Sequence, residues 1–152
     1  RKGSIGSKGS KESRESKGSR EEGDMAKIDR FEDIKVWKEG RKLTRGIYEI
    51  SSSGGFARDF GLKDQIRRAS VSVMLNIAEG FARKSDKEFA RFLVQSHGSA
   101  AEVQSALYVA FDQGYITKKQ FDRFCTFTEK ISKMIMKFTL YLTKGRTKQT
   151  TP

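Results

Sequence analysis

Residues 85–114 read SDKEFARFLVQSHGSAAEVQSALYVAFDQG, and this stretch decides the fold. Its apolar and small residues recur at steps of three and four, the spacing that places side chains on one face of a helix. A capping box, Ser85 followed three residues later by Glu88, marks where this helix begins. Gly114 fits the left-handed position at which a helix ends. The members of the stripe are Phe89, Leu93, Ser96, Ala100, Val103, Leu107 and Ala110.

Helical spacing recurs in three further stretches, and strand-like alternation is absent from the sequence. The three cover residues 31–51, 60–84 and 117–145, and the last begins at a second capping box headed by Thr117. Only a few residues separate the last three helices, and links that short force neighbouring helices to run antiparallel. The sequence therefore predicts an all-α protein, an antiparallel up-down four-helix bundle, over residues 25–145.

Two segments outside the bundle have compositions typical of disorder. Residues 1–24 contain one aliphatic residue, Ile5, no aromatic residue, and charges of both signs. Such a segment cannot bury enough apolar surface to offset its chain entropy, so we predict a disordered low-complexity tail. A functional basic tail is the alternative, and Met25 is a candidate for the natural start of the protein. Residues 146–152 are predicted to form a disordered basic C-terminal tail.

The charge balance of the chain is strongly basic. It has 31 Lys+Arg against 19 Asp+Glu, a net charge of +12, and residues 25–152 alone hold 24 basic and 14 acidic residues, a net +10. A positive field attracts polyanions, chiefly nucleic acid, and also acidic membrane surfaces. The alternative is a solvated basic surface that serves solubility.

Several classes of protein are disfavoured. No run of 18 apolar residues predicts a membrane span, and no apolar segment near the N-terminus predicts secretion, so we expect a cytoplasmic protein. The single cysteine, Cys125, excludes an internal disulfide and is predicted to be a small core residue. The single histidine, His97, lacks a second ligand at metal-binding spacing, and no nucleophile–base pair is visible. We predict a non-enzymatic protein without metal, cofactor or small-molecule substrate.

A row of polar residues follows one face of the second predicted helix. These residues recur at steps of three and four beside the apolar stripe of the same helix, within a largely apolar segment. One interpretation is a solvated outer face with ordinary neighbouring pairs. The other is a polar network at an interface with another helix or subunit. We call this row the polar seam, and its members are Arg68, Ser72, Asn76, Glu79 and Arg83.

Residues 65–80, QIRRASVSVMLNIAEG, resemble the signature of the four-helix-bundle proteins encoded in 23S ribosomal RNA intervening sequences. That family reads approximately Q-I-R-R-A-x-x-S-I-x-x-N-I-A-E-G. The resemblance extends over about residues 29–143. Members usually carry a Phe-Pro pair in the loop after the first helix, where this chain has Phe56-Ala57, so the conformation of that loop is not carried over. Further matching positions are Phe31, Val36-Trp37, Arg83, Ser85, Phe89, Phe92-Leu93, Gly98 through Glu102, and Gly114 through Ile116.

The resemblance implies an antiparallel bundle that assembles into a homo-oligomeric, five-fold ring with no established activity. A related group, the accessory variability proteins of diversity-generating retroelements, pairs such a ring with a reverse transcriptase and binds nucleic acid. In a ring, Arg68, Asn76 and Glu79 would belong to a network within or between subunits, and Glu102 is a candidate partner of Arg68. The expected function is a scaffold for structured RNA or DNA, with RNA favoured. The alternative is a protein–protein adaptor, for example for a reverse transcriptase.

Candidate phosphate contacts gather in two places. One is the corner between the second and third helices, and the other is one face of the last helix with the residues that follow it. The alternative is again a solvated face. The sequence has no RNA-recognition motif and its aromatic residues lie on core stripes, so we expect recognition of phosphate and shape that salt weakens. The candidates are Arg83, Lys84, Lys87, Arg91, Lys130, Lys133, Lys137, Lys144 and Arg146.

Overall fold

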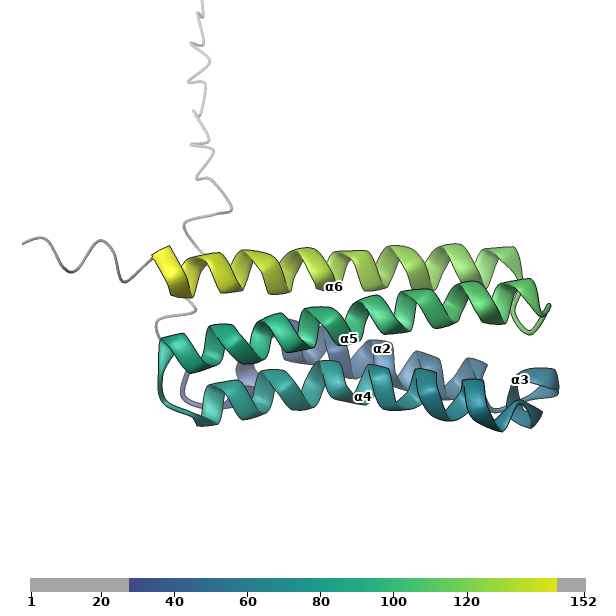
Figure 1. Ribbon diagram of the computed structural model, residues 1–152, viewed down its shortest axis with the longest axis horizontal. Coiled ribbons are helices and arrows are strands. Elements are labelled where there is room, and N and C mark those ends of the chain that lie inside the picture. The colour runs from purple at the N-terminus through teal and green to yellow at the C-terminus, as the bar shows by residue number, and fades with distance from the viewer. Residues whose placement is uncertain (1–27, 145–152) are drawn as a thin grey trace, which may run out of the picture.

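The computed structural model describes residues 28–144, and four long antiparallel helices make up most of them (Figure 1). This arrangement confirms the predicted all-α bundle, and residues 28–144 contain no strand. The tails predicted at residues 1–24 and 146–152 lie outside the described residues. In chain order the elements are η1 (Phe31–Asp33), α2 (Lys35–Ile50), α3 (Gly54–Arg58), α4 (Phe60–Ala82), α5 (Asp86–Asp112) and α6 (Lys118–Lys144).

The helix ends that the sequence marks are formed as expected. The Ser85 hydroxyl accepts a hydrogen bond from the Glu88 backbone amide at 3.4 Å and so caps α5. Thr117 and Gln120 cap α6 reciprocally, because each side chain accepts from the other residue's backbone amide, at 3.1 and 2.9 Å. Gly114 has a φ of +71°, and this left-handed residue turns the chain from α5 toward α6.

Two predicted helix boundaries are wrong by a few residues. The first helix was expected from Phe31, but α2 begins at Lys35 because Ile34 is extended and buries its side chain, which is 1% exposed. The second helix was expected to reach Lys84, but α4 ends at Ala82. Lys84 has a φ of +57°, which a continuing right-handed helix does not allow.

The segment after α2 contains a short helix that the sequence pattern did not predict. The side chain of Phe56 is fully buried, and its ring centroid lies 5.7 Å from that of Tyr115. The Tyr115 hydroxyl donates to a carboxylate oxygen of Asp59 at 3.0 Å, and the other Asp59 oxygen accepts from the Leu62 amide and caps α4. These contacts anchor α3 to the two helix ends beside it.

Close contact between α4 and α5 organises the core. The Ser96 hydroxyl is fully buried and donates to the Val73 carbonyl oxygen at 2.8 Å, which sets the register of these two helices. Gly80 of α4 lies against Phe89 and Phe92 of α5. Within residues 28–144, no helix has both the length and the apolar content that a bilayer crossing requires.

Replacing Gly80 with alanine should lower the free energy of unfolding by about 1–3 kcal/mol through overpacking. A Cβ at this position would lie 2.8 Å from the Cβ of Phe92 and 3.3 Å from the Phe89 carbonyl oxygen. The matched control is Gly98→Ala in α5, where a Cβ meets nothing within 4 Å. Because alanine is the better helix former, the control should gain up to about 1 kcal/mol. Urea denaturation measures both, and shifts of the same sign would contradict the prediction.

Candidate nucleic-acid interface

A cleft of about 880 Å³ lies between the start of α2 and the second half of α6. Two lysines of α2, Lys35 and Lys38, line one side of it. Three lysines of α6, Lys130, Lys133 and Lys137, line the other side. We call this feature the lysine cleft.

Helix geometry explains why these side chains face one opening. On α6, steps of three and four place Lys130, Lys133 and Lys137 on one side of the helix, beside the buried Ile131 and Phe138.

On α2, Lys35 and Lys38 are three residues apart and therefore one turn apart. Because Ile34 is extended, α2 starts at Lys35, and its N-terminus adds a positive partial charge at this end of the cleft.

The floor of the lysine cleft is apolar. Ile34, Val36 and Phe138 are buried core residues that also line it, and Met134 and Ile28 are half-buried there. The opening therefore combines cationic side chains with an apolar base.

Basic residues outnumber acidic ones in the lysine cleft. Two carboxylates line it, those of Asp33 and Glu129, against five lysines. One oxygen of Glu129 accepts a hydrogen bond from the Gln104 amide at 3.1 Å. Among residues 28–144, Lys130 and Lys133 have no ion-pair partner, and the stretch of α6 from Lys130 onward contains no acidic residue. The cleft therefore holds an excess of positive charge.

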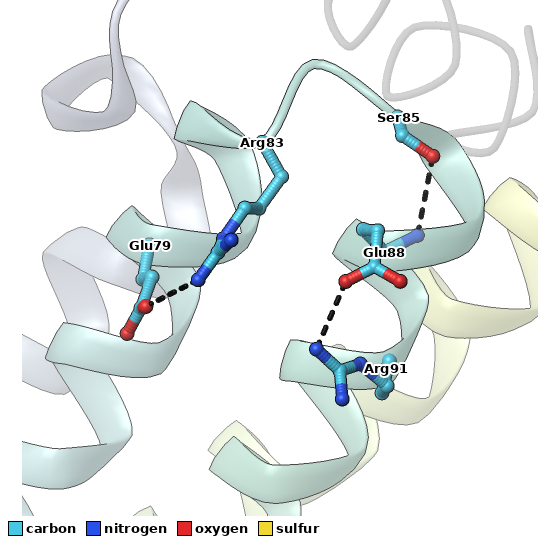
Figure 2. A network of polar contacts seen from close by, with 5 residues as sticks. All are labelled: Glu79, Arg83, Ser85, Glu88 and Arg91. Carbon is cyan, nitrogen blue, oxygen red and sulfur yellow. Dashed lines mark hydrogen bonds and ion pairs between the residues drawn. The ribbon is translucent and has the colours of Figure 1, made fainter.

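The corner between α4 and α5 is basic but partly neutralised, as Figure 2 shows. Arg83 pairs with Glu79 at 2.9 Å, and Arg91 pairs with Glu88 at 2.9 Å. Both guanidinium groups also lie over the ring of Phe92, at 5.1 and 5.2 Å from its centroid. The sequence predicted four candidate phosphate contacts here, and the structure gives the two arginines carboxylate partners.

The remaining lysines of the corner are exposed. Lys84 lies over the Phe81 ring, with its ammonium 5.0 Å from the centroid, and Lys87 follows on the first turn of α5. We call Arg83, Lys84, Lys87 and Arg91 the basic corner.

The lysine cleft and the basic corner lie toward the same end of the bundle. The turn between α4 and α5, the start of α2 and the end of α6 meet at that end (Figure 1). Three rings connect the two sites through the core: Phe81 lies 6.1 Å from Phe89, which lies 5.1 Å from Phe138 in the cleft floor. Lys144 ends α6 on this side, and the candidate Arg146 lies outside the described residues.

The polar seam runs along the outside of α4 in the described chain. Arg68 pairs with Asp64 at 3.1 Å, and the Asn76 amide donates to the Ser72 carbonyl oxygen at 2.9 Å. Arg68 and Glu79 are exposed. All these contacts stay within α4, so the seam is not a buried network inside one protomer.

The predicted pair between Arg68 and Glu102 is not formed within residues 28–144, because Arg68 pairs with Asp64 instead. The contact between Ser96 and Val73 nevertheless places Arg68 and Glu102 at nearly the same height on adjacent helices. An interface between subunits along the seam stays a prediction.

Sequence reasoning missed three residues that the structure makes prominent. Lys35 and Lys38 were not among the candidates. Their spacing of three is visible in the sequence, but the packing that brings them beside α6 is not. Arg67 was part of the quoted motif but had no assigned role. Its guanidinium donates to the Ser51 hydroxyl at 2.8 Å and to the Tyr48 carbonyl oxygen at 3.3 Å, and so caps the end of α2.

Two observations concern groups that could bind a metal ion or act as a nucleophile. Residues 28–144 contain no cluster of three His, Cys, Asp or Glu side chains that could hold a metal ion. Burial raises the pKa of the half-buried Cys125 thiol, and the carboxylates of Glu129 and Asp122 raise it further, so the thiolate is disfavoured.

Comparisons with known proteins add the following. The family model described as 23S rRNA-intervening sequence protein matches residues 32–137. A crystal structure of a protein with unknown function from the S23 ribosomal protein family of Bacteroides thetaiotaomicron is similar, with a TM-score of 0.63 and 21% identity over 68% of this chain and 97% of that chain. At this identity the likeness shows the fold alone. No curated protein matches the chain. None of these findings bears on the implied relation to accessory variability proteins, which stays a prediction.

Proposed function

The chain belongs to the family of 23S rRNA-intervening sequence proteins, and from this premise we propose that it is a non-enzymatic, homo-oligomeric bundle that binds structured RNA or DNA. RNA is the favoured ligand. Binding uses the basic end of the bundle and reads phosphates and overall shape rather than base sequence.

The excess of lysines in the lysine cleft carries this proposal. Five lysines from two helices face one opening with two carboxylates, and the basic corner adds further cations toward the same end. A basic surface that only serves solubility does not require cations from distant parts of the sequence to lie around one cleft. Lysines and arginines that contact phosphates release counterions from the nucleic acid, which makes affinity steeply dependent on salt.

A salt titration tests the proposal. Fluorescence anisotropy with an RNA hairpin measures the association constant K at each salt concentration. A plot of log K against log[salt] should have a slope of about −4 to −5, as expected for roughly five phosphate contacts. Binding that does not change between low and physiological salt would contradict the electrostatic mechanism. Absence of binding at any salt concentration would refute the proposed function.

The proposed oligomer is a five-fold ring in which the polar seam contacts a neighbouring subunit. The apolar side chain of Leu75 is 60% exposed on α4, next to the half-buried Ser72 and Asn76. An apolar residue flanked by hydrogen-bonding groups on an outer helix face suits a contact between copies. Several copies of the basic end on one assembly would add avidity to modest individual contacts.

Replacing Asn76 with leucine is expected to change the mass of the assembly measured by light scattering, because the seam loses its polar specificity. The control is Gln95→Leu, an exposed polar residue on the outer face of α5. The control should leave the mass unchanged. If Asn76→Leu also leaves it unchanged, the seam is a solvated face.

A protein–protein adaptor, for example for a reverse transcriptase, is the second candidate function. It is favoured by exposed apolar side chains on α5 and α6, among them Val94, Tyr108 and Leu140, which are 56%, 57% and 47% exposed. An adaptor of this kind would bind its protein partner equally well after the cleft lysines are neutralised, whereas the proposed RNA binding would be lost.

A further inference from the structure

The lysine cleft has a feature that phosphate binding alone does not need. Its rim is cationic, but its floor consists of Ile34, Val36, Met134 and Phe138. Phosphates are bound well by exposed cations on a flat surface. The volume of about 880 Å³ lies within the range of pockets that hold small organic molecules, roughly 300–1,000 Å³.

We propose that the lysine cleft receives one unpaired nucleotide of a structured RNA, as found in a bulge or a loop. Its flanking phosphates lie along the lysines, and its base covers the apolar floor. This inference rests on the proposed function and names the part of the RNA that the site recognises.

The arrangement of cations on two walls supports this occupant. At 1.5 Å per residue, Lys130 and Lys137 are about 10 Å apart along α6. Successive phosphates of one strand are spaced roughly 3.4 Å along a duplex axis, so the row spans more than one phosphate. Lys35 and Lys38 face the same opening from α2, which places cations on both sides of the apolar floor.

The apolar floor selects an unpaired base. In a paired helix the base faces are stacked inside, and the duplex offers this cleft phosphates, sugars and base edges but no base face. A nucleotide splayed out of the helix presents a base face, and covering the half-buried Met134 and Ile28 of the floor with it removes apolar surface from water. The paired hairpin and the bulged hairpin therefore make the same rim contacts but differ at the floor.

Two RNA hairpins of equal stem length test this, each closed by a non-nucleotide linker so that the loop supplies no unpaired base. One stem is fully paired and the other carries a single unpaired adenosine, and both are measured with the full chain near 0.15 M salt. The bulged hairpin should bind about tenfold more tightly by fluorescence anisotropy, in line with the contribution of one stacked base. Met134→Gln, which keeps charge and length, should abolish this preference, so that the two hairpins bind with equal affinity. Lys130→Gln should weaken both hairpins by the same factor.

The matched control is Met136→Gln. Met136 lies two residues along α6, is 43% exposed and lines a different hollow beside His97. It should keep the preference for the bulge. Circular dichroism and thermal melting verify that each variant is folded.

Three outcomes would overturn the inference. Equal affinity of the wild-type chain for the two hairpins refutes it while leaving the proposed function standing. The inference is also wrong if an acidic polypeptide displaces both hairpins equally and Met134→Gln changes the affinity for neither RNA. The cleft would then bind polyanions in general. Absence of binding to both hairpins at low salt refutes the proposed function together with the inference.

Discussion

Replacing Lys130, Lys133 and Lys137 together with glutamine is expected to weaken RNA binding roughly 100-fold at 0.15 M salt. Each lost phosphate contact lowers the association constant by a factor of about [salt] to the power −0.9. At 0.15 M salt this factor is roughly five to six. Three contacts together give the expected loss, and the salt slope should fall in magnitude by about 2.7. Glutamine keeps much of the side-chain length, and all three positions are exposed, so the fold should be retained.

The control for this variant removes the same charge from the other end of α6. Lys118, Lys119 and Arg123 are exposed near the start of the helix, about 10 to 18 Å before Lys130 at 1.5 Å per residue. That distance exceeds the Debye length of about 8 Å at physiological salt. Glutamine at these three positions should cost less than about threefold in affinity. An equal loss in both variants would mean that net charge, not the cleft, drives binding.

Truncating Phe56 to alanine should lower the free energy of unfolding by about 3–5 kcal/mol, the largest single-residue effect on stability that we expect. The side chain is fully buried and its ring packs on Tyr115, which in turn bonds to Asp59 at the start of α4. Its loss leaves a cavity where α3, α4 and the turn before α6 meet. Urea denaturation monitored by circular dichroism measures the change.

Phe60→Ala is the matched control. It deletes the same side chain four residues later, where Phe60 is 73% exposed. Its effect on the free energy of unfolding should stay within about 0.5 kcal/mol. Similar losses in the two variants would show that Phe56 does not anchor α3.

The periodic parts of the fold were predictable from the sequence. Apolar spacing located four helices, and the caps at Ser85, Thr117 and Gly114 identified turns that the structure contains. Helix ends that depend on burial were not predictable. Ile34 is extended, and its side chain is buried in the core. Phe56 is also buried, and the Gly-rich segment around it forms the short helix α3. Both side chains gain contacts with residues distant in sequence.

The candidate site was predictable only in part. The lysine row of α6 shows as a spacing of three and four, but Lys35 and Lys38 join it only because α2 starts beside the second half of α6. Arg83 and Arg91 show as cations in the sequence, and their carboxylate partners lie three and four residues away. The pair of Glu79 and Arg83 is one of the neighbouring pairs that the solvated-face interpretation of the polar seam expects, and Glu88 with Arg91 follows the same helical spacing.

The sequence by itself determined the class of fold, the four long helices and the excess of basic charge, since periodicity, capping and composition are local properties of the chain. Only the tertiary structure decided that lysines nearly one hundred residues apart in sequence share one cleft with an apolar floor. The physical reason is that antiparallel packing fixes which helix ends meet. The burial of Ile34 then fixes where α2 begins, and with it the position of Lys35 and Lys38 opposite α6.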